Sequence, residues 1–131
     1  MSNGRLEFLG DAVLSIVVTD HIFATYAEMP EGELAKVRAS VVSAVTLAEV
    51  AGELRLGDAV RLGKGEDASG GRLKASILAD AMEAVFGAVY IDGGIDAARP
   101  LIIGLLEDRI ASAAIGPGGH DYKTQLQELA A

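Results

Sequence analysis

The sequence contains no cysteine, only two histidines, and three prolines against sixteen glycines. Without cysteine the chain can form no disulfide, no thiolate-ligated zinc site and no thiol nucleophile. Neither histidine has the Ser and Asp context of a catalytic triad or the H-E-x-x-H spacing of a zinc protease. The glycine and proline content also shows no collagen-like or low-complexity bias. These absences exclude most nucleophilic and zinc-dependent chemistries.

Long uncharged segments and positive charge are also scarce. The longest uncharged stretches run about ten residues, well short of the roughly 18 that span a bilayer, and no basic-then-apolar signal opens the chain. We therefore expect no membrane segment and a cytoplasmic protein. Eleven basic against 19 acidic residues give a net charge of −8. Such a chain repels nucleic acid unless cations or a basic patch intervene.

Half of the 131 residues are hydrophobic, which predicts one compact folded domain. Apolar residues recur at helical spacing along nearly the whole chain, and alternating β-branched residues between turn signals are rare. The pattern predicts an all-α fold. Helices are expected over about 6–26, from Pro30 to 54, over 73–90, from Asp96 onward, and from Asp121.

Local signals predict where these helices start and stop. The second stretch is expected to break between residues 43 and 46, with Thr46 capping a new start. Gly93 and Gly94 are expected to end the helix over 73–90. Pro100 is tolerated because it lies in or near the first turn after an Asp96 cap. Residues 57–71 and 116–119 are expected to be loops.

Four carboxylates stand in the two most apolar predicted helices. Glu7 and Asp11 are four residues apart and are the only charges in most of the first helix. Asp80 and Glu83 are three apart and are the only charges in the third helix after Lys74. Each pair therefore shares one helix face. Because both helices are apolar nearly all round, we expect the acids to be buried and to need compensating positive charge.

Two sources of positive charge are compatible with this spacing. Arg5, Arg38 or Lys74 could form structural salt bridges with the acids. Alternatively, a hard divalent cation such as Mg²⁺ takes oxygen ligands, with waters and phosphate oxygens completing its octahedron. The excess of acids favours a metal, but E-x-x-x-D and D-x-x-E pairs are common on helices. Spacing alone leaves both alternatives open.

Four segments resemble the endonuclease domain of the ribonuclease III family, in the order in which that family carries them. They are N-G-R-L-E-F-L-G-D-A-V-L at 3–14, P-E-G-E-L-A-K-V-R-A-S at 30–40, G-G-R-L-K-A-S-I-L-A-D-A-M-E-A at 70–84 and D-Y-K-T-Q-L-Q-E at 121–128. The first run is long and specific, and together the four span nearly the whole chain. The four acids fall on the family's metal and catalytic positions.

The resemblance implies an all-α, dimeric endonuclease that depends on Mg²⁺, with Mn²⁺ as a substitute. Such an enzyme cuts both strands of double-stranded RNA, leaves 5′-phosphate and 3′-hydroxyl ends, and processes ribosomal and messenger RNA precursors. The resemblance also implies that the chain pairs with a second copy of itself, and that it needs neither a membrane nor a small-molecule organic cofactor. The alternative is a weak or inactive dimerising module that holds RNA or a second subunit without cutting.

The resemblance also implies roles for individual residues. It assigns metal ligation to Glu7, Asp11, Asp80 and Glu83, and catalysis most directly to Asp11 and Glu83. Contacts in the cleft or with RNA fall to Glu31, Lys74, Ser76 and Gln127, with Ser76 at the start of the helix that presents Asp80 and Glu83. Phe8 is the dimer residue, which packs into a socket on the partner subunit.

Three features depart from the family pattern. Gly4 stands where the family usually has Glu, on the helix face of Glu7 and Asp11, so one cleft carboxylate is missing. The chain opens directly on the signature, without the family's N-terminal helices, and no C-terminal double-stranded-RNA-binding domain follows. We therefore expect residues 1–131 to form one endonuclease domain truncated at its N-terminus, whose final helix begins within 121–131.

Overall fold

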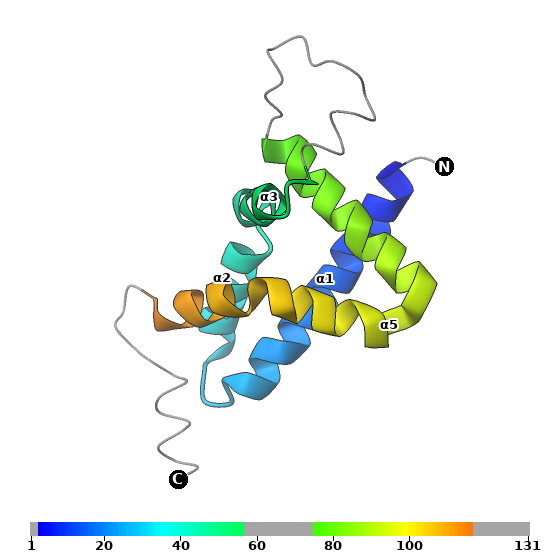
Figure 1. The fold of residues 1–131 in the computed structure, drawn as a ribbon. Helices are drawn as coiled ribbons and strands as arrows, with labels where there is room; N and C mark the ends of the chain where they lie inside the picture. The colour runs from blue at the N-terminus through cyan, green and yellow to red at the C-terminus, as the bar shows by residue number, and fades with distance from the viewer. Residues whose placement is uncertain (1–2, 57–74, 117–131) are drawn as a thin grey trace.

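The computed structural model describes residues 3–56 and 75–116, and every regular element in these ranges is an α-helix (Figure 1). The helices are α1 (Asn3–Thr25), α2 (Glu31–Val41), α3 (Ala44–Glu53) and α5 (Ala75–Ile115). The predicted all-α fold is confirmed. Lys74, Gln127, the loop predicted over 57–71 and the final helix predicted from Asp121 lie outside the described residues, as do all residues but Gly116 of the loop predicted over 116–119.

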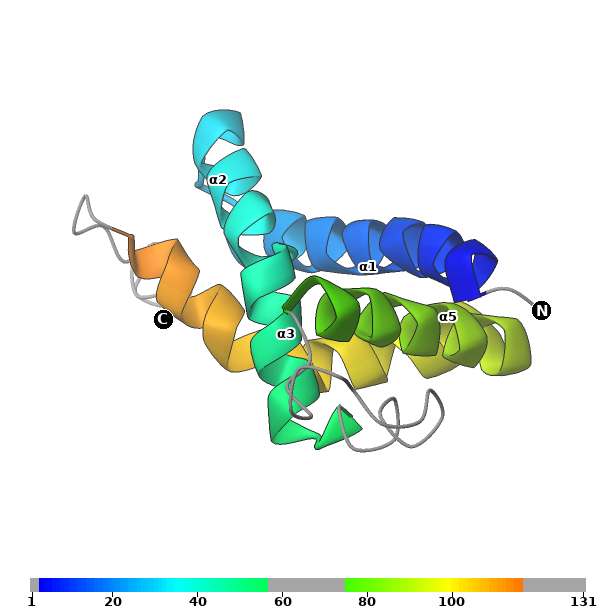
Figure 2. The ribbon, with the colours of Figure 1, turned by 90° about the horizontal axis from the view of Figure 1, so that it is seen from above.

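The long helix α1 packs against the first half of α5: the two cross in Figure 1 and lie next to each other in the view of Figure 2. Five apolar residues of α1 are at most 4% exposed: Val13, Leu14, Val17, Val18 and Ile22. By length and composition α1 could cross a membrane. Its buried residues instead form the core of the folded chain together with Met82 and Phe86 of α5, so the packing accounts for this part of its apolar surface.

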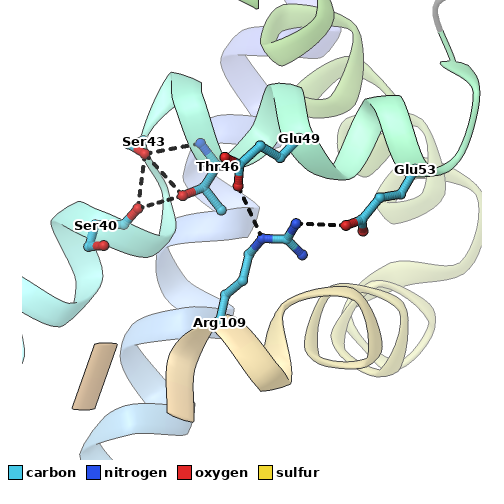
Figure 3. A network of polar contacts seen from close by, with 6 residues as sticks. All are labelled: Ser40, Ser43, Thr46, Glu49, Glu53 and Arg109. Carbon is cyan, nitrogen blue, oxygen red and sulfur yellow. Dashed lines mark hydrogen bonds and ion pairs between the residues drawn. The ribbon is translucent and has the colours of Figure 1, made fainter. Parts of the chain in front are cut away.

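The break between α2 and α3 is confirmed, but its cap is Ser43 and not Thr46. The Ser43 hydroxyl accepts a hydrogen bond from the Thr46 backbone N–H at 3.2 Å. Thr46 is the third residue of α3, one of the positions whose N–H an N-cap side chain usually binds. Both hydroxyls also donate to the Ser40 carbonyl at 2.9 Å (Figure 3). The earlier helix, α2, begins directly after Pro30, as predicted from the preference of proline for helix starts.

A kink divides α5 where the sequence predicts a helix end. Gly94 has φ 71° and ψ −169° inside the helix, a conformation that glycine adopts without steric cost. The expected Asp96 cap is wrong, because the non-helical residue is Gly94 and Asp96 already lies within the helix that follows. Pro100 therefore sits in the helix interior, where it removes one backbone hydrogen bond.

Beyond the kink, the second half of α5 crosses α1 and packs against α3 (Figure 1). Its residues Ile102, Leu106 and Ile110 are at most 1% exposed and complete the core. Arg99 binds Asp20 of α1 at 2.7 Å. Arg109 binds two carboxylates of α3, Glu53 at 2.9 Å and Glu49 at 3.6 Å (Figure 3). These ion pairs join the second half of α5 to α1 through Arg99 and to α3 through Arg109.

Candidate functional site

The two pairs of acids meet where α1 crosses the first half of α5. Glu7 and Asp11 come from α1, and Asp80 and Glu83 from α5. The side chains of Glu83 and Asp11 share a hydrogen bond, and the negative charges of Asp11, Asp80 and Glu7 all act on Glu83. The structure therefore brings the four predicted acids together, and we call them the four-acid cluster.

The cluster changes the acidity of Glu83. Partial burial, the hydrogen bond with Asp11 and the neighbouring negative charges raise the pKa of Glu83 from 4.5 to about 7. Near neutral pH the Glu83 carboxyl is therefore about half protonated. A perturbed carboxyl of this kind marks a candidate functional site, because repulsion between the acids must be relieved by a proton or by a cation.

The expectation that these acids are buried is wrong. Asp11 and Asp80 are exposed, Glu7 and Glu83 are half-buried, and no polar or charged residue among residues 3–56 and 75–116 is buried. The apolar pattern suggested helices enclosed on all sides, but α1 and α5 leave their acidic faces open to solvent. The acids therefore interact with a ligand in solution more readily than buried groups would.

Arginine does not neutralise the four-acid cluster in the described part of the chain. The ion pairs there are Lys36–Glu33, Arg99–Asp20, and Arg109 with Glu49 and Glu53. Of the arginines considered above, Arg38 donates to the Thr19 hydroxyl at 3.4 Å, and Arg5 forms no ion pair within the described ranges. The structure therefore gives no support to salt bridges from these two residues.

The oxygen donors of the cluster suit a hard divalent cation. Within residues 3–56 and 75–116, no three Asp, Glu or His side chains converge closely enough to coordinate one ion as they are oriented. The acids can still affect the pKa of Glu83, because charges act on one another over several ångströms. Direct coordination requires a closer approach, since Mg²⁺ binds oxygen at 2.0–2.1 Å and keeps several of its waters. The cluster therefore fits a cation held partly through water, or one toward which the acidic side chains rotate.

Two glycines that the sequence reasoning did not single out lie at the same crossing. A Cβ added to Gly10 would overlap the Glu83 carbonyl, and one added to Gly87 would overlap the Leu6 carbonyl. The helices thus touch backbone to backbone beside the acids. The available signal was a glycine in the middle of each apolar helix, where it costs about 1 kcal/mol relative to alanine unless the packing requires it.

The remaining predicted residues lie at different distances from the cluster. Ser76 is exposed in the first turn of α5, one turn before Asp80 and on the same face, as predicted. Glu31, at the start of α2, lines a cavity of about 190 Å³ with Thr19 and Phe23. This cavity lies beside the other end of α1 from Glu7. Within one chain, the structure therefore does not bring Glu31 to the four-acid cluster.

The predicted dimer residue stands on the surface next to the cluster. Phe8 is 83% exposed, and Ile16 and Phe23, farther along α1, are 55% and 71% exposed. With the exposed Ala12, they lie within one sector of the helix, because 3.6 residues make one turn. Exposed aromatic rings in a row indicate a surface that another protein covers.

Comparison with known proteins identifies the family. A sequence model of the ribonuclease-III-like family matches residues 1–109. The Ribonuclease 3 proteins of Streptomyces coelicolor and Thermobifida fusca are each 55% identical over 130 residues, which make up 99% of this chain and 47% and 54% of those proteins. The chain thus spans about half the length of the curated relatives it matches.

Solved structures agree with this comparison. The nuclease domain of ribonuclease III from Campylobacter jejuni has a TM-score of 0.71 and 38% sequence identity, covering 83% of this chain and 76% of that one. That structure concerns flexibility in a region involved in dimer formation of the nuclease domain. This chain belongs to the ribonuclease-III-like family, and its helical fold is that of ribonuclease III nuclease domains.

Proposed function

We propose that this chain is the nuclease domain of a divalent-metal-dependent endoribonuclease that hydrolyses phosphodiester bonds in both strands of double-stranded RNA. The products carry 5′-phosphate and 3′-hydroxyl ends. The observation that carries the proposal is the four-acid cluster: two helices converge on it, and the pKa of Glu83 is raised to about 7. Family membership supports the same reaction.

Each acid has a role in this scheme. Glu7, Asp11, Asp80 and Glu83 hold Mg²⁺, or Mn²⁺ in its place, and Asp11 and Glu83 are the residues closest to the chemistry. Bound there, a divalent ion supplies an activated water and neutralises the charge that develops on the leaving 3′ oxygen. Glu83, whose pKa is raised to about 7 beside Asp11, can exchange a proton near neutral pH. The negative cluster then attracts the RNA backbone only once cations fill it.

The RNA partner is recognised by shape. Duplex RNA presents 2′-hydroxyls and phosphates across a wide minor groove, and Ser76 lies exposed one turn from Asp80, where a backbone contact supports cleavage. Lys74, Gln127 and Glu31 are assigned to the same cleft from the family pattern. In the cell the proposed substrates are precursors of ribosomal and messenger RNA in the cytoplasm.

The proposed active form is a homodimer built on the exposed face of α1. Phe8, at 83% exposed, is the anchor that enters the partner subunit. An aromatic ring is the kind of residue that dominates protein interfaces once it is buried in a fitted pocket.

The test is cleavage of labelled duplex RNA by the full chain, with Mg²⁺ and with EDTA. Cutting of both strands that requires the metal supports the proposal, and a folded, dimeric chain that binds duplex RNA without cutting it contradicts it. A single-stranded RNA of the same sequence controls for contaminating nucleases.

An inactive dimerising module is the second candidate, and Gly4 is the observation that favours it. Gly4 is exposed near the start of α1, on the face of Glu7 and Asp11, where the family usually carries a glutamate. Gly4→Glu should raise cleavage or metal affinity modestly if the parent is an enzyme. A parent that cuts nothing until this glutamate is restored would favour the module.

A further inference from the structure

We propose that Gly10 and Gly87 are positioning residues, whose missing side chains let α1 and α5 touch and thereby set the spacing of the four-acid cluster. This proposal rests on the function proposed above, since it gives that spacing a role in metal binding. The two glycines make no contact with RNA or metal in this scheme. They act only through the backbones that carry the acids.

The environment of Gly10 leaves no room for a side chain. An added Cβ would overlap the Glu83 carbonyl oxygen and would lie 2.7 Å from the Glu83 carbonyl carbon and 3.0 Å from the Gly87 nitrogen. Ordinary van der Waals contact begins near 3.4 Å. All of these neighbours are backbone atoms, which cannot rotate away as a flexible side chain can. A methyl group at position 10 would therefore force the helices apart.

Gly87 makes the reciprocal contact. A Cβ added there would overlap the Leu6 carbonyl oxygen and would lie 3.1 Å from its carbonyl carbon and 3.2 Å from the Gly10 nitrogen. Each glycine thus faces the other glycine and also the carbonyl group that lies one turn before that other glycine on the opposite helix. Helices usually pack 8–10 Å apart, at a distance set by the side chains between them. Here no side chain lies between them at the contact.

The crossing is tied directly to the acids. Asp11 follows Gly10 in the chain, and the carbonyl that Gly10 touches belongs to Glu83 itself. Any separation of the helices at this point therefore moves the backbone of Glu83 away from that of Asp11. Mg²⁺ accepts little departure from octahedral geometry at 2.0–2.1 Å, so a shift of these two backbones disturbs the arrangement of its ligands.

Three other helical glycines provide matched controls. Gly32 on α2, Gly52 on α3 and Gly104 on α5 are exposed, and an added Cβ at each meets nothing within 4 Å. Alanine is a better helix former than glycine. Gly32→Ala, Gly52→Ala and Gly104→Ala should therefore melt at the same or a slightly higher temperature than the parent, with unchanged function.

The experiment compares these controls with Gly10→Ala and Gly87→Ala in the full chain, at a temperature where circular dichroism shows every variant folded. Calorimetry with Mn²⁺ in the absence of RNA should show affinity reduced by about 10-fold or more for Gly10→Ala. Duplex cleavage should fall about 100-fold in kcat. Gly87→Ala should have smaller effects, because its closest contacts beyond the overlapped oxygen are looser.

A crystal structure of Gly10→Ala separates this proposal from the proposed function. The backbones at residues 10 and 83 should lie farther apart, and the Glu83–Asp11 hydrogen bond should be lost. If the parent neither binds Mn²⁺ nor cuts RNA, the proposed function fails, while a widened crossing still supports the spacing role. A folded Gly10→Ala with the parent's helix spacing and Mn²⁺ affinity overturns the glycine proposal. If Gly10→Ala does not fold, the same readouts on Gly87→Ala decide it.

Discussion

Two regions of this protein gather acidic side chains, and they treat them in opposite ways. On α3, Glu49 and Glu53 share one arginine, and hydrogen bonding to Glu53 raises the pKa of Arg109 (Figure 3). In the four-acid cluster, no ion pair within the described ranges reaches the acids, and the pKa of Glu83 rises to about 7. The acids on α3 are neutralised by an arginine of the same chain. We expect the four-acid cluster to be neutralised by a bound ligand instead.

The two regions also differ in how their helices contact each other. Arg109 reaches across a polar surface groove whose lining includes Ser112 and Asp108, so side chains bridge α3 and α5. At the cluster, Gly10 and Gly87 remove side chains and let the helices touch. A long flexible arginine tolerates small shifts, while a backbone contact does not. We therefore expect substitutions to affect stability in the first region and chemistry in the second.

The largest effect is expected from Glu83→Gln. This change keeps the size of the side chain but removes the carboxylate that the cluster perturbs most, so single-turnover cleavage of duplex RNA should fall by roughly 10³-fold or more. Duplex binding, followed by gel shift, should survive. Glu49→Gln is the matched control in the arginine-paired region and should cut normally. Equal cleavage by Glu83→Gln and the parent would contradict the assigned role.

Association of the two subunits gives the next largest effect. Phe8 is more exposed than Val45, which is 66% exposed on α3, yet only Phe8 lies on the proposed dimer face. Phe8→Ala should weaken the dimer by a few kcal/mol, measured by sedimentation over a range of protein concentrations. Val45→Ala should leave association unchanged. A parent that sediments as a monomer at about 10 μM would argue against a stable dimer, because a dimer with a dissociation constant well below that concentration would be mostly assembled.

Through the cluster, rising pH should lower the free energy of unfolding, and a bound metal should raise it. Between pH 4.5 and about 7 the folded chain keeps a proton on Glu83 that the unfolded chain has released. The free energy of unfolding should therefore fall as pH rises through this window, and the loss should be complete above the folded pKa. Urea denaturation in EDTA at fixed protein concentration measures this slope, which Glu83→Gln should flatten. An identical slope in the parent and this variant would exclude Glu83 as its source.

Mg²⁺ should restore the stability that the folded chain loses as pH rises. A ligand that binds the folded chain better than the unfolded one raises the melting temperature, and ionised acids bind metal better than protonated ones. The gain in melting temperature with Mg²⁺ should therefore be larger at pH 8 than at pH 5.5. Asp80→Asn should reduce it, and Glu53→Gln should not. No gain at either pH would contradict a metal site in the cluster.

Sequence reasoning predicted the helices and the two acid pairs from periodicity, whereas the assignment of all four acids to one site came from the family resemblance. Apolar spacing placed α1 and α5, and acids three or four apart had to share a face. It failed where the outcome depends on how helices pack. None of the four acids proved buried, since only one side of each helix is covered. Gly10 and Gly87 were missed because their role depends on a contact with another helix. The predicted cap Thr46 lies three residues after the observed cap Ser43, because both hydroxyl side chains can bond to the same backbone groups. The predicted cap Asp96 lies two residues after the non-helical Gly94.

The smallest effect is expected from removing the arginine of the first region. Arg109→Met keeps much of the apolar stem, which is only 26% exposed, but leaves Glu49 and Glu53 without their partner. Because both glutamates are more than half exposed, water can solvate them, and ion pairs of this kind contribute about 1 kcal/mol or less. Urea denaturation should show a loss of that size, reduced further in 1 M salt, where charge interactions are screened. Mn²⁺ affinity and duplex cleavage should match the parent, since Arg109 reaches no acid of the cluster. A large loss of cleavage in a stable Arg109→Met protein would show that the two acidic regions are coupled, and would break the comparison on which these expectations depend.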